Sequence, residues 1–176
     1  MIARLHLRTI PQLAVLVALF VVGAATRAGA QASPQNSQVY DCGDLIREQE
    51  IDRVIGQSGT KLAFSSRDAQ DPSVPGYTEC DYDLPGGVVL GVAVFTGAAR
   101  ENIDQAWTLS QGAGAKAISG IGESALLADA PGGRIILVRV RGGRGVRVNA
   151  GDVEGSGRLD LDEVIKRVAA IVVPRI

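Results

Sequence analysis

Histidine is almost absent from this sequence of 176 residues, in which His6 is the single example. The chain beyond it therefore offers no Ser-His-Asp or Cys-His nucleophile system, no histidine general base and no histidine-ligated zinc site. Aromatic residues are also scarce, at 4%. Beyond residue 30 they are Tyr40, Phe64, Tyr77, Tyr82, Phe95 and Trp107. Because several of these are needed for a core, a sugar-stacking surface is not expected.

The charge balance excludes two further classes of protein. Hydrophobic residues make up 46% of the chain and charged residues 21%, with a formal net charge of -1. A chain of this composition is neither disordered nor a nucleic-acid-coating protein, and nucleic acid is not an expected partner. The length suits one domain of ordinary size.

The N-terminus has the pattern of a secretory signal peptide over residues 1–30. Arg4 and Arg8 supply the positive region, Leu13 to Ala25 is an apolar run, and small residues follow, so that cleavage after Ala30 or Ala32 is acceptable. A retained anchor is the alternative, but a span needs about 20 apolar residues and this run is shorter. We therefore expect an exported protein, periplasmic or extracellular, with no membrane span after signal removal.

Two cysteines, Cys42 and Cys80, remain in the exported chain. Oxidising compartments let disulfides persist, so we expect a bond between them. The alternative is a redox pair, but such pairs favour a close C-x-x-C spacing, which this sequence lacks. A structural disulfide is the better interpretation.

The rest of the chain predicts a flexible lead-in over 31–39 and a single disulfide-stapled domain over 40–176. Helices are expected over 44–55, with a break near 47–49 as an alternative, over 98–111, and from Leu161 to before Pro174. Strands are expected over 61–66, 77–84, 88–96, 115–119, 124–129, 135–140 and 146–149. The predicted fold class is α+β, an antiparallel sheet of about six to seven strands with three flanking helices.

A weak internal repeat joins two parts of this pattern. Pro85-Gly86-Gly87 and Pro131-Gly132-Gly133 are followed by similar apolar residues at the same offset. The pattern indicates two related units, each a helix, a short strand and a β-hairpin. The alternative is that one turn chemistry was used twice by chance, because Pro and Gly are common in turns.

Three short motifs resemble a known group of proteins. They are Cys42 before a helix that ends Val54-Ile55-Gly56, then Cys80-Asp81-Tyr82, then the segment from Ile118 to Ala125. Together they resemble the small exported domains of unknown function found in actinobacterial cell-envelope lipoproteins, and the extracellular sensor domain of mycobacterial receptor kinases. The resemblance implies a disulfide-stapled sheet with a binding or sensing role, and it carries over no catalytic residues.

The segment from Gly120 to Ala125 fits the dinucleotide-loop pattern G-x-G-x-x-[GA]. That pattern requires a helix directly afterwards, and Pro131 follows too soon for one. A tight turn is the better interpretation of these glycines.

The segment 152–163 matches the spacing of a twelve-residue calcium loop. Its candidate oxygen ligands are Asp152, Glu154, Ser156, Asp160 and Glu163, with Gly157 at the sharp turn. The alternative is a helix N-terminus in which Asp160 caps and Glu163 completes a capping box. The capping interpretation is favoured, because a lone calcium loop without its pair is a weak match. Calcium is the one cofactor candidate, and none is otherwise expected.

Five arginines form a second candidate site, for an anionic envelope component or another partner. They are Arg134, Arg139, Arg141, Arg144 and Arg147, in a stretch without acidic residues. If Val140 opposes Val146 across an odd-length turn, Arg139 faces Arg147. Opposed like charges are unfavourable, so an acidic side chain or an anionic ligand is expected nearby. The plainer alternative is that these arginines pair with the protein's own carboxylates.

The third candidate is a strand that carries Glu79, Asp81 and Asp83 on one face. Two carboxyls about 5 to 10 Å apart in a cleft can hydrolyse a glycosidic bond. Nothing in the sequence indicates a cleft, so an enzyme is not expected. The favoured function is a secreted, non-catalytic binding or sensor-like domain for a small ligand or an envelope component. A calcium-binding structural or adhesive module and a carboxylate-based hydrolase are the alternatives.

Overall fold

The computed structural model describes residues 37–66, 75–153, 155 and 157–176. The predicted signal peptide and most of the predicted lead-in lie outside these residues, so both stay predictions. None of the helices within the described part combines the length and the apolar character needed to cross a bilayer.

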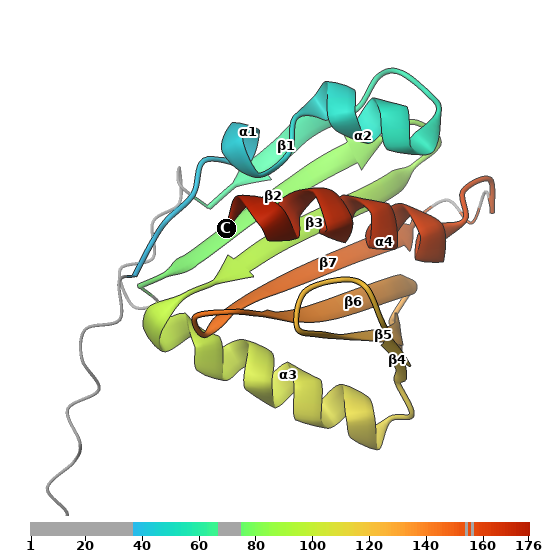
Figure 1. The fold of residues 1–176 in the computed structure, drawn as a ribbon. Helices are drawn as coiled ribbons and strands as arrows, with labels where there is room; N and C mark the ends of the chain where they lie inside the picture. Colours follow the sequence, from blue (N-terminus) through green and yellow to red (C-terminus); the bar gives the residue numbers. More distant parts are fainter. Residues whose placement is uncertain (1–36, 67–74, 154, 156) are drawn as a thin grey trace, which may run out of the picture. The chain divides into compact units, whose positions relative to one another are not determined.

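In the part of the chain that the structure describes, four α-helices and two short 3-10 turns accompany the sheet (Figure 1). In chain order they are α1 (Cys42–Leu45), α2 (Glu48–Ile55), η1 (Gly97–Ala99), α3 (Arg100–Gly112), α4 (Leu161–Val172) and η2 (Val173–Arg175). The first predicted helix is divided, as the alternative held, because Ile46 and Arg47 have extended backbone between α1 and α2. Gly56 ends α2 in the left-handed conformation, with φ 69°.

Seven strands form one antiparallel sheet, which confirms the predicted fold class. They are β1 (Lys61–Ser65), β2 (Tyr77–Leu84), β3 (Val88–Phe95), β4 (Lys116–Ile118), β5 (Ser124–Ala130), β6 (Gly133–Val140) and β7 (Arg144–Asp152). Their order across the sheet is β1-β2-β3-β7-β6-β5-β4. The last strand of the chain therefore lies in the centre.

The order reveals two matching halves. A helix and three strands, α2-β1-β2-β3, lie on one side of β7, and α3-β4-β5-β6 lie on the other. A rotation of 180° about the axis of β7 exchanges the two halves, and because it turns the sheet over, it also exchanges the faces. The helices obey this operation, since α2 packs on one face and α3 on the opposite face (Figure 1). The predicted repeat of a helix, a short strand and a hairpin is thus present in the topology.

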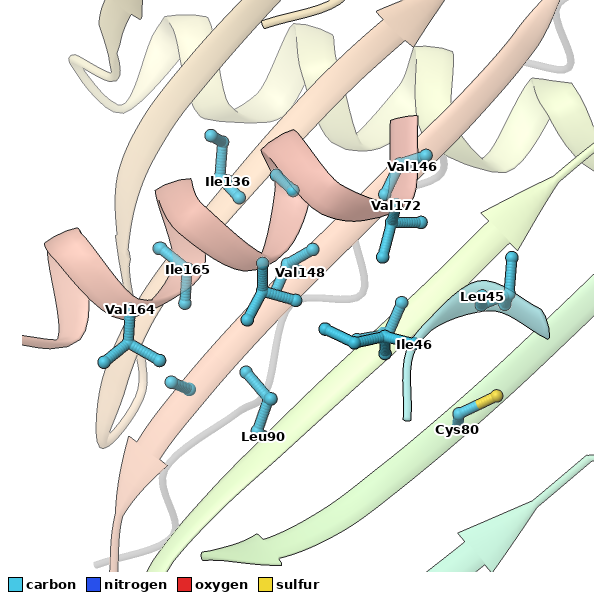
Figure 2. Close-up of a cluster of buried hydrophobic side chains, with 14 of the residues drawn as sticks. Leu45, Ile46, Cys80, Leu90, Ile136, Val146, Val148, Val164, Ile165 and Val172 are labelled. Atoms are coloured by element: carbon cyan, nitrogen blue, oxygen red, sulfur yellow. The ribbon is translucent and has the colours of Figure 1, made fainter. Parts of the chain in front are cut away.

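One face of the sheet, here called the α4 face, carries the larger core (Figure 2). Alternate residues of a strand point to opposite faces, and those on the α4 face include Leu90, Ile136 and Val148, each 0% exposed. Val164, Ile165, Val168 and Val172 recur at helical spacing on α4 and pack against β6 and β7.

The disulfide between Cys42 and Cys80 is formed, as predicted, with the two Cα atoms 5.8 Å apart. It joins α1 to β2 on the α4 face, where Leu45 and Ile46 are fully buried beside it (Figure 2). The hydroxyl of Tyr82 donates to the carbonyl oxygen of Ile46 at 2.9 Å. The short helix α1 is thus held on the sheet by a covalent bond as well as by packing.

The opposite face, here called the α3 face, has a smaller core. Ile103 and Trp107 of α3 pack with Phe95 and Leu137, in line with the prediction that Trp107 is a core residue. Because α3 follows β3 and precedes β4, it crosses from the centre of the sheet to the β4 edge. The half of the α3 face on β1, β2 and β3 lies on the other side of that path.

The predicted register of the β6-β7 hairpin was wrong by two residues. Val138, and not Val140, opposes Val146, and Arg139 opposes Gly145 in place of Arg147. The turn has an odd length, as expected, but it is shorter, because Val140 already pairs with Arg144. Two consecutive glycines, Gly142 and Gly143, each at φ 74°, make this tight reversal.

Candidate functional site

Four of the five predicted arginines form salt bridges with carboxylates of this chain, including Arg141 with Glu123 at 3.8 Å. On the α4 face, Arg134 contacts Asp129 and Asp162. On the α3 face, Arg139 donates to Asp104 Oδ1 from Nε at 3.1 Å and from Nη2 at 2.8 Å.

The guanidinium of Arg139 also lies over the ring of Trp107, 4.3 Å from its centroid. Arg147 donates from Nη2 to Glu79 Oε1 at 2.6 Å and to the Tyr77 hydroxyl at 3.3 Å. The expected acidic neighbours are therefore present, supplied by the protein itself. Arg141 and Arg144 lie apart from this group, at the β6-β7 turn.

The acidic residues of β2 lie on the α3 face, because Cys80, Tyr82 and Leu84 between them point into the α4-face core. Glu79 pairs across the sheet with Ala93, Asp81 with Gly91, and Asp83 with Val89. One end of this half of the sheet packs with α3, since Tyr77, Ala93 and Phe95 belong to the smaller core. Asp81 and Asp83 thus lie on this face and have no salt-bridge partner among the described residues. Glu79, in contrast, forms a salt bridge with Arg147.

Asp81, Gly91 and Asn149 form a row across three strands, here called the Gly91 row. Gly91 of β3 pairs with Asp81 on one side and with Asn149 of β7 on the other. A Cβ atom placed on Gly91 would meet Asn149 Oδ1 at 2.8 Å, Asn149 Nδ2 at 2.9 Å and Asp81 Oδ1 at 3.0 Å. The carboxylate and the amide therefore lean toward each other over a position that only hydrogen occupies.

The polar atoms of this row are available for a ligand. In the described part of the chain, neither the Asp81 carboxylate nor the Asn149 amide has a side-chain hydrogen bond. Between them they offer carboxylate acceptors, an amide acceptor and an amide donor. On β1, Phe64 pairs with Asp81 and remains 41% exposed, so an aromatic ring stands next to the row.

The environment of Asp81 disfavours its ionised form. Partial burial raises the pKa of this carboxyl above its usual value of 3.8, the negative charges of Glu79 and Asp83 raise it further, and Arg147 opposes them. Burial also raises the pKa of the neighbouring Tyr77 hydroxyl, so it stays protonated. An ionised carboxyl that costs free energy in the folded protein is a frequent mark of functional positions.

The sequence could predict only part of this site. The alternation of β2 placed Glu79, Asp81 and Asp83 on one face, and that placement is confirmed. Gly91 and Asn149 gave no signal, because their relation to Asp81 comes from the pairing of β2 with β3 and of β3 with β7.

The structure places the described residues of the calcium candidate in local contacts. Asp152 Oδ2 accepts from the Gly157 N–H at 2.7 Å, and Asp160 Oδ1 accepts from the Glu163 N–H at 3.2 Å. Glu163 forms an ion pair with Arg167 at 2.6 Å. Asp160 thus acts as the N-cap of α4, as predicted, but the predicted capping box is not formed, because the Glu163 side chain pairs with Arg167. Glu154 and Ser156 lie outside the described residues, and calcium binding stays a prediction.

Among the residues that the structure describes, no three His, Cys, Asp or Glu side chains are grouped so as to hold a metal ion. The glycines of the dinucleotide-like segment form a turn, since Gly120 and Gly122 have positive φ and the strand β5, not a helix, follows.

No family model matches this chain. No curated protein matches it either. Among solved structures, it is similar to the extracellular domain of PknH from Mycobacterium tuberculosis, with a TM-score of 0.49 and 16% identity over 76% of this chain and 92% of that chain. The neighbour is an extracellular domain. At this level of similarity the comparison assigns no function.

Proposed function

We propose that the protein is an exported, non-catalytic binding domain of the sensor type, and that a small polar ligand binds over the Gly91 row. The observation that carries the proposal is the convergence of Asp81 Oδ1 and the Asn149 amide over Gly91. The disulfide supports export, because such bonds persist in oxidising compartments.

The symmetry of the fold supports the same place. On the α4 face, α4 packs across β7 and β6. The rotation about β7 carries that position to the α3 face, across β7 and β3, which is where the Gly91 row lies. On this side α3 contacts both β7 and β3, through a cluster that includes Ala93 and Phe95 and does not include Gly91. The surface is polar at this position, so it suits a hydrogen-bonding ligand better than an apolar helix.

The chemistry of the ligand follows from the groups present. Glu79, Asp81 and Asp83 outnumber the two cations on this half of the face, Arg147 and Lys61, of which Lys61 pairs across the strands with Asp83. Positively charged or hydroxyl-bearing small molecules can satisfy the carboxylate and the amide, and the ring of Phe64 offers an apolar side.

The experiment is an amide-shift titration of the oxidised protein, residues 31–176, with defined mixtures of amines, amino acids and sugars. We expect at least one compound to shift the amides of Asp81, Gly91 and Asn149 in a saturable manner. Gly91→Ala should abolish those shifts, because its methyl group displaces both side chains. Gly112→Ala is the control, since a Cβ at Gly112 meets nothing within 4 Å. Shifts confined to other surfaces, or shifts that survive in Gly91→Ala, would refute the proposal.

The raised pKa of Asp81 favours a second candidate, a carboxylate-based hydrolase in which Asp81 is the proton donor. Its second carboxylate would be Glu79, which Arg147 holds at 2.6 Å. Incubation with a panel of chromogenic glycosides distinguishes the two functions. Turnover that is lost in Asp81→Asn would support the hydrolase, whereas binding without turnover supports the sensor-type domain.

A further inference from the structure

A groove on the α4 face lies between the helices α2 and α4, which pack side by side over the sheet (Figure 1). Its volume is about 410 Å³, within the range of sites for small molecules. Residues three or four apart share one side of a helix, and the groove follows this spacing along both helices. The described residues that line this α2-α4 groove are Glu50, Arg53, Val54, Arg167, Ile171 and Arg175.

Two of the three arginines in the α2-α4 groove are paired with carboxylates. Arg175 binds Glu50 through two contacts, from Nη1 to Oε2 at 3.0 Å and from Nη2 to Oε1 at 2.6 Å. Arg167 forms an ion pair with Glu163, one turn back along α4, at 2.6 Å.

The third arginine, Arg53, leaves the groove with one uncompensated positive charge. In the described part of the chain Arg53 has no salt bridge, and its Nε donates to the Gln49 carbonyl oxygen at 3.1 Å. The pKa of Glu50 is lowered mainly by its hydrogen bond with Arg175, and the charge of Arg53 adds to this effect. The guanidinium of Arg53 therefore lies close to the Glu50–Arg175 pair without replacing it.

Val54 and Ile171 supply the apolar part of the groove. Both side chains are half-buried and pack at the margin of the α4-face core. None of the described residues that line the groove is aromatic. The groove thus offers aliphatic contacts beside an uncompensated guanidinium, which suits a ligand with an aliphatic chain and a negative charge.

We propose that the α2-α4 groove binds a small monocarboxylate with a short aliphatic chain. The carboxylate pairs with the guanidinium of Arg53, and the chain lies against Val54 and Ile171. A single negative charge matches the excess of one, whereas a phosphate monoester carries close to two and would be repelled by Glu50. Guanidinium groups pair well with carboxylates, and the Glu50–Arg175 pair is an example in the same groove.

The test is an amide-shift titration of the oxidised protein with hexanoate. Three compounds are compared with it: 1-hexanol has the chain without the charge, acetate has the charge without the chain, and hexyl phosphate has the chain with a second charge. We expect saturable shifts at Arg53, Val54 and Ile171 with hexanoate, and binding that is severalfold weaker for each of the other three. Shifts that leave the groove unaffected would overturn the site, and tighter binding of hexyl phosphate would overturn the choice of a monocarboxylate.

Two variants separate the charge from the chain. Arg53→Gln should weaken hexanoate binding severalfold, because it removes the uncompensated charge. Val54→Thr has nearly the same size but adds a hydroxyl group, so it should weaken the binding of hexanoate and leave that of acetate unchanged.

The control is Arg141→Gln, which removes the same charge from a side chain that is 90% exposed at the β6-β7 turn. It should bind hexanoate as the wild type does. Equal weakening by Arg53→Gln and Arg141→Gln would show general charge attraction and refute the proposal, as would unchanged binding by Arg53→Gln. The groove and the Gly91 row lie on opposite faces of the sheet, so either proposal can fail without the other.

Discussion

Two residues on the α3 face, Asp81 and Gly91, are unfavourable for the stability of the fold. The Asp81 carboxyl is half-buried beside two other acids, and its pKa is raised mainly because burial disfavours the charge. Gly91 sits in the middle of a central strand, where glycine is usually unfavourable. Both choices weaken the sheet, and both create the polar row that they share with Asn149.

We expect Asp81→Asn to stabilise the fold at neutral pH. A carboxyl with a raised folded pKa binds its proton more tightly in the folded state, so its contribution to stability falls as pH rises through that pKa. The neutral amide removes this penalty. Urea unfolding at pH 7 should therefore give a higher midpoint for Asp81→Asn than for the wild type, and the difference should shrink toward pH 3. A lower midpoint at pH 7 would contradict the argument.

At the scale of elements, the sequence predicted the type of each helix or strand better than the register in which the strands pair. Periodicity located α3 and α4, which each bury a stripe of apolar residues, and a continuous apolar run located β3, which is buried on both faces. The register of the β6-β7 hairpin was wrong because alternation fixes the face of a residue but leaves steps of two residues undecided. Two adjacent glycines then allowed a shorter turn than the valine pattern suggested.

Edge protection was equally hidden in the sequence. The backbone N–H of Leu62 on edge strand β1 donates to Glu48 Oε1 at 2.8 Å, and that of Thr60 donates to Asp52 Oδ1 at 3.0 Å. Both carboxylates come from α2, which is brought to the edge by tertiary packing. Such contacts cover donors that would otherwise be free to pair with another strand.

We expect Asp160→Ala to lower the free energy of unfolding by about 1 kcal/mol, the usual cost of a lost N-cap. The reason is the bond from the Glu163 N–H to Asp160 Oδ1 at the start of α4. The measurement is chemical denaturation in EDTA and again in millimolar calcium.

Capping alone predicts the same loss under both conditions. A wild-type midpoint that rises with calcium, in a manner that Asp160→Ala and Glu163→Gln abolish, would identify the segment 152–163 as a metal site instead.

At the scale of the molecule, Arg175 in η2, next to the C-terminal residue, contacts α1 and α2. Arg175 donates from Nη1 to the Leu45 carbonyl at 2.9 Å and from Nη2 to Glu50 Oε1 at 2.6 Å. This contact lowers the pKa of Glu50 from 4.5 to about 2, with help from the Arg47 backbone N–H. No sequence pattern links these positions, because they meet only after α2 and α4 have packed side by side.

We expect the Glu50–Arg175 pair to make stability depend on pH in a defined window. Because the folded pKa of Glu50 is lowered, its contribution is complete above about pH 4.5 and is lost as the pH falls toward 2. Glu50→Gln should lower the free energy of unfolding by about 1 kcal/mol at pH 7, which is the upper end of the range for partly exposed ion pairs. Near pH 2 the substitution should change it little. Glu101→Gln, on the exposed side of α3, is the control. A cost that persists unchanged at pH 2 would assign the effect to packing.

The central position of β7 has a consequence for how such a chain is made. β3 and β6 both present an unpaired inner edge until Arg144–Asp152 is available, because β7 pairs with both of them. Val88 pairs with Asp152, and Leu90 pairs with Ala150, although each pair is separated by 60 or more residues of chain. Contacts of such long range form late. A polypeptide that is threaded through a membrane N-terminus first would thus complete its sheet on the far side only after β7 had crossed.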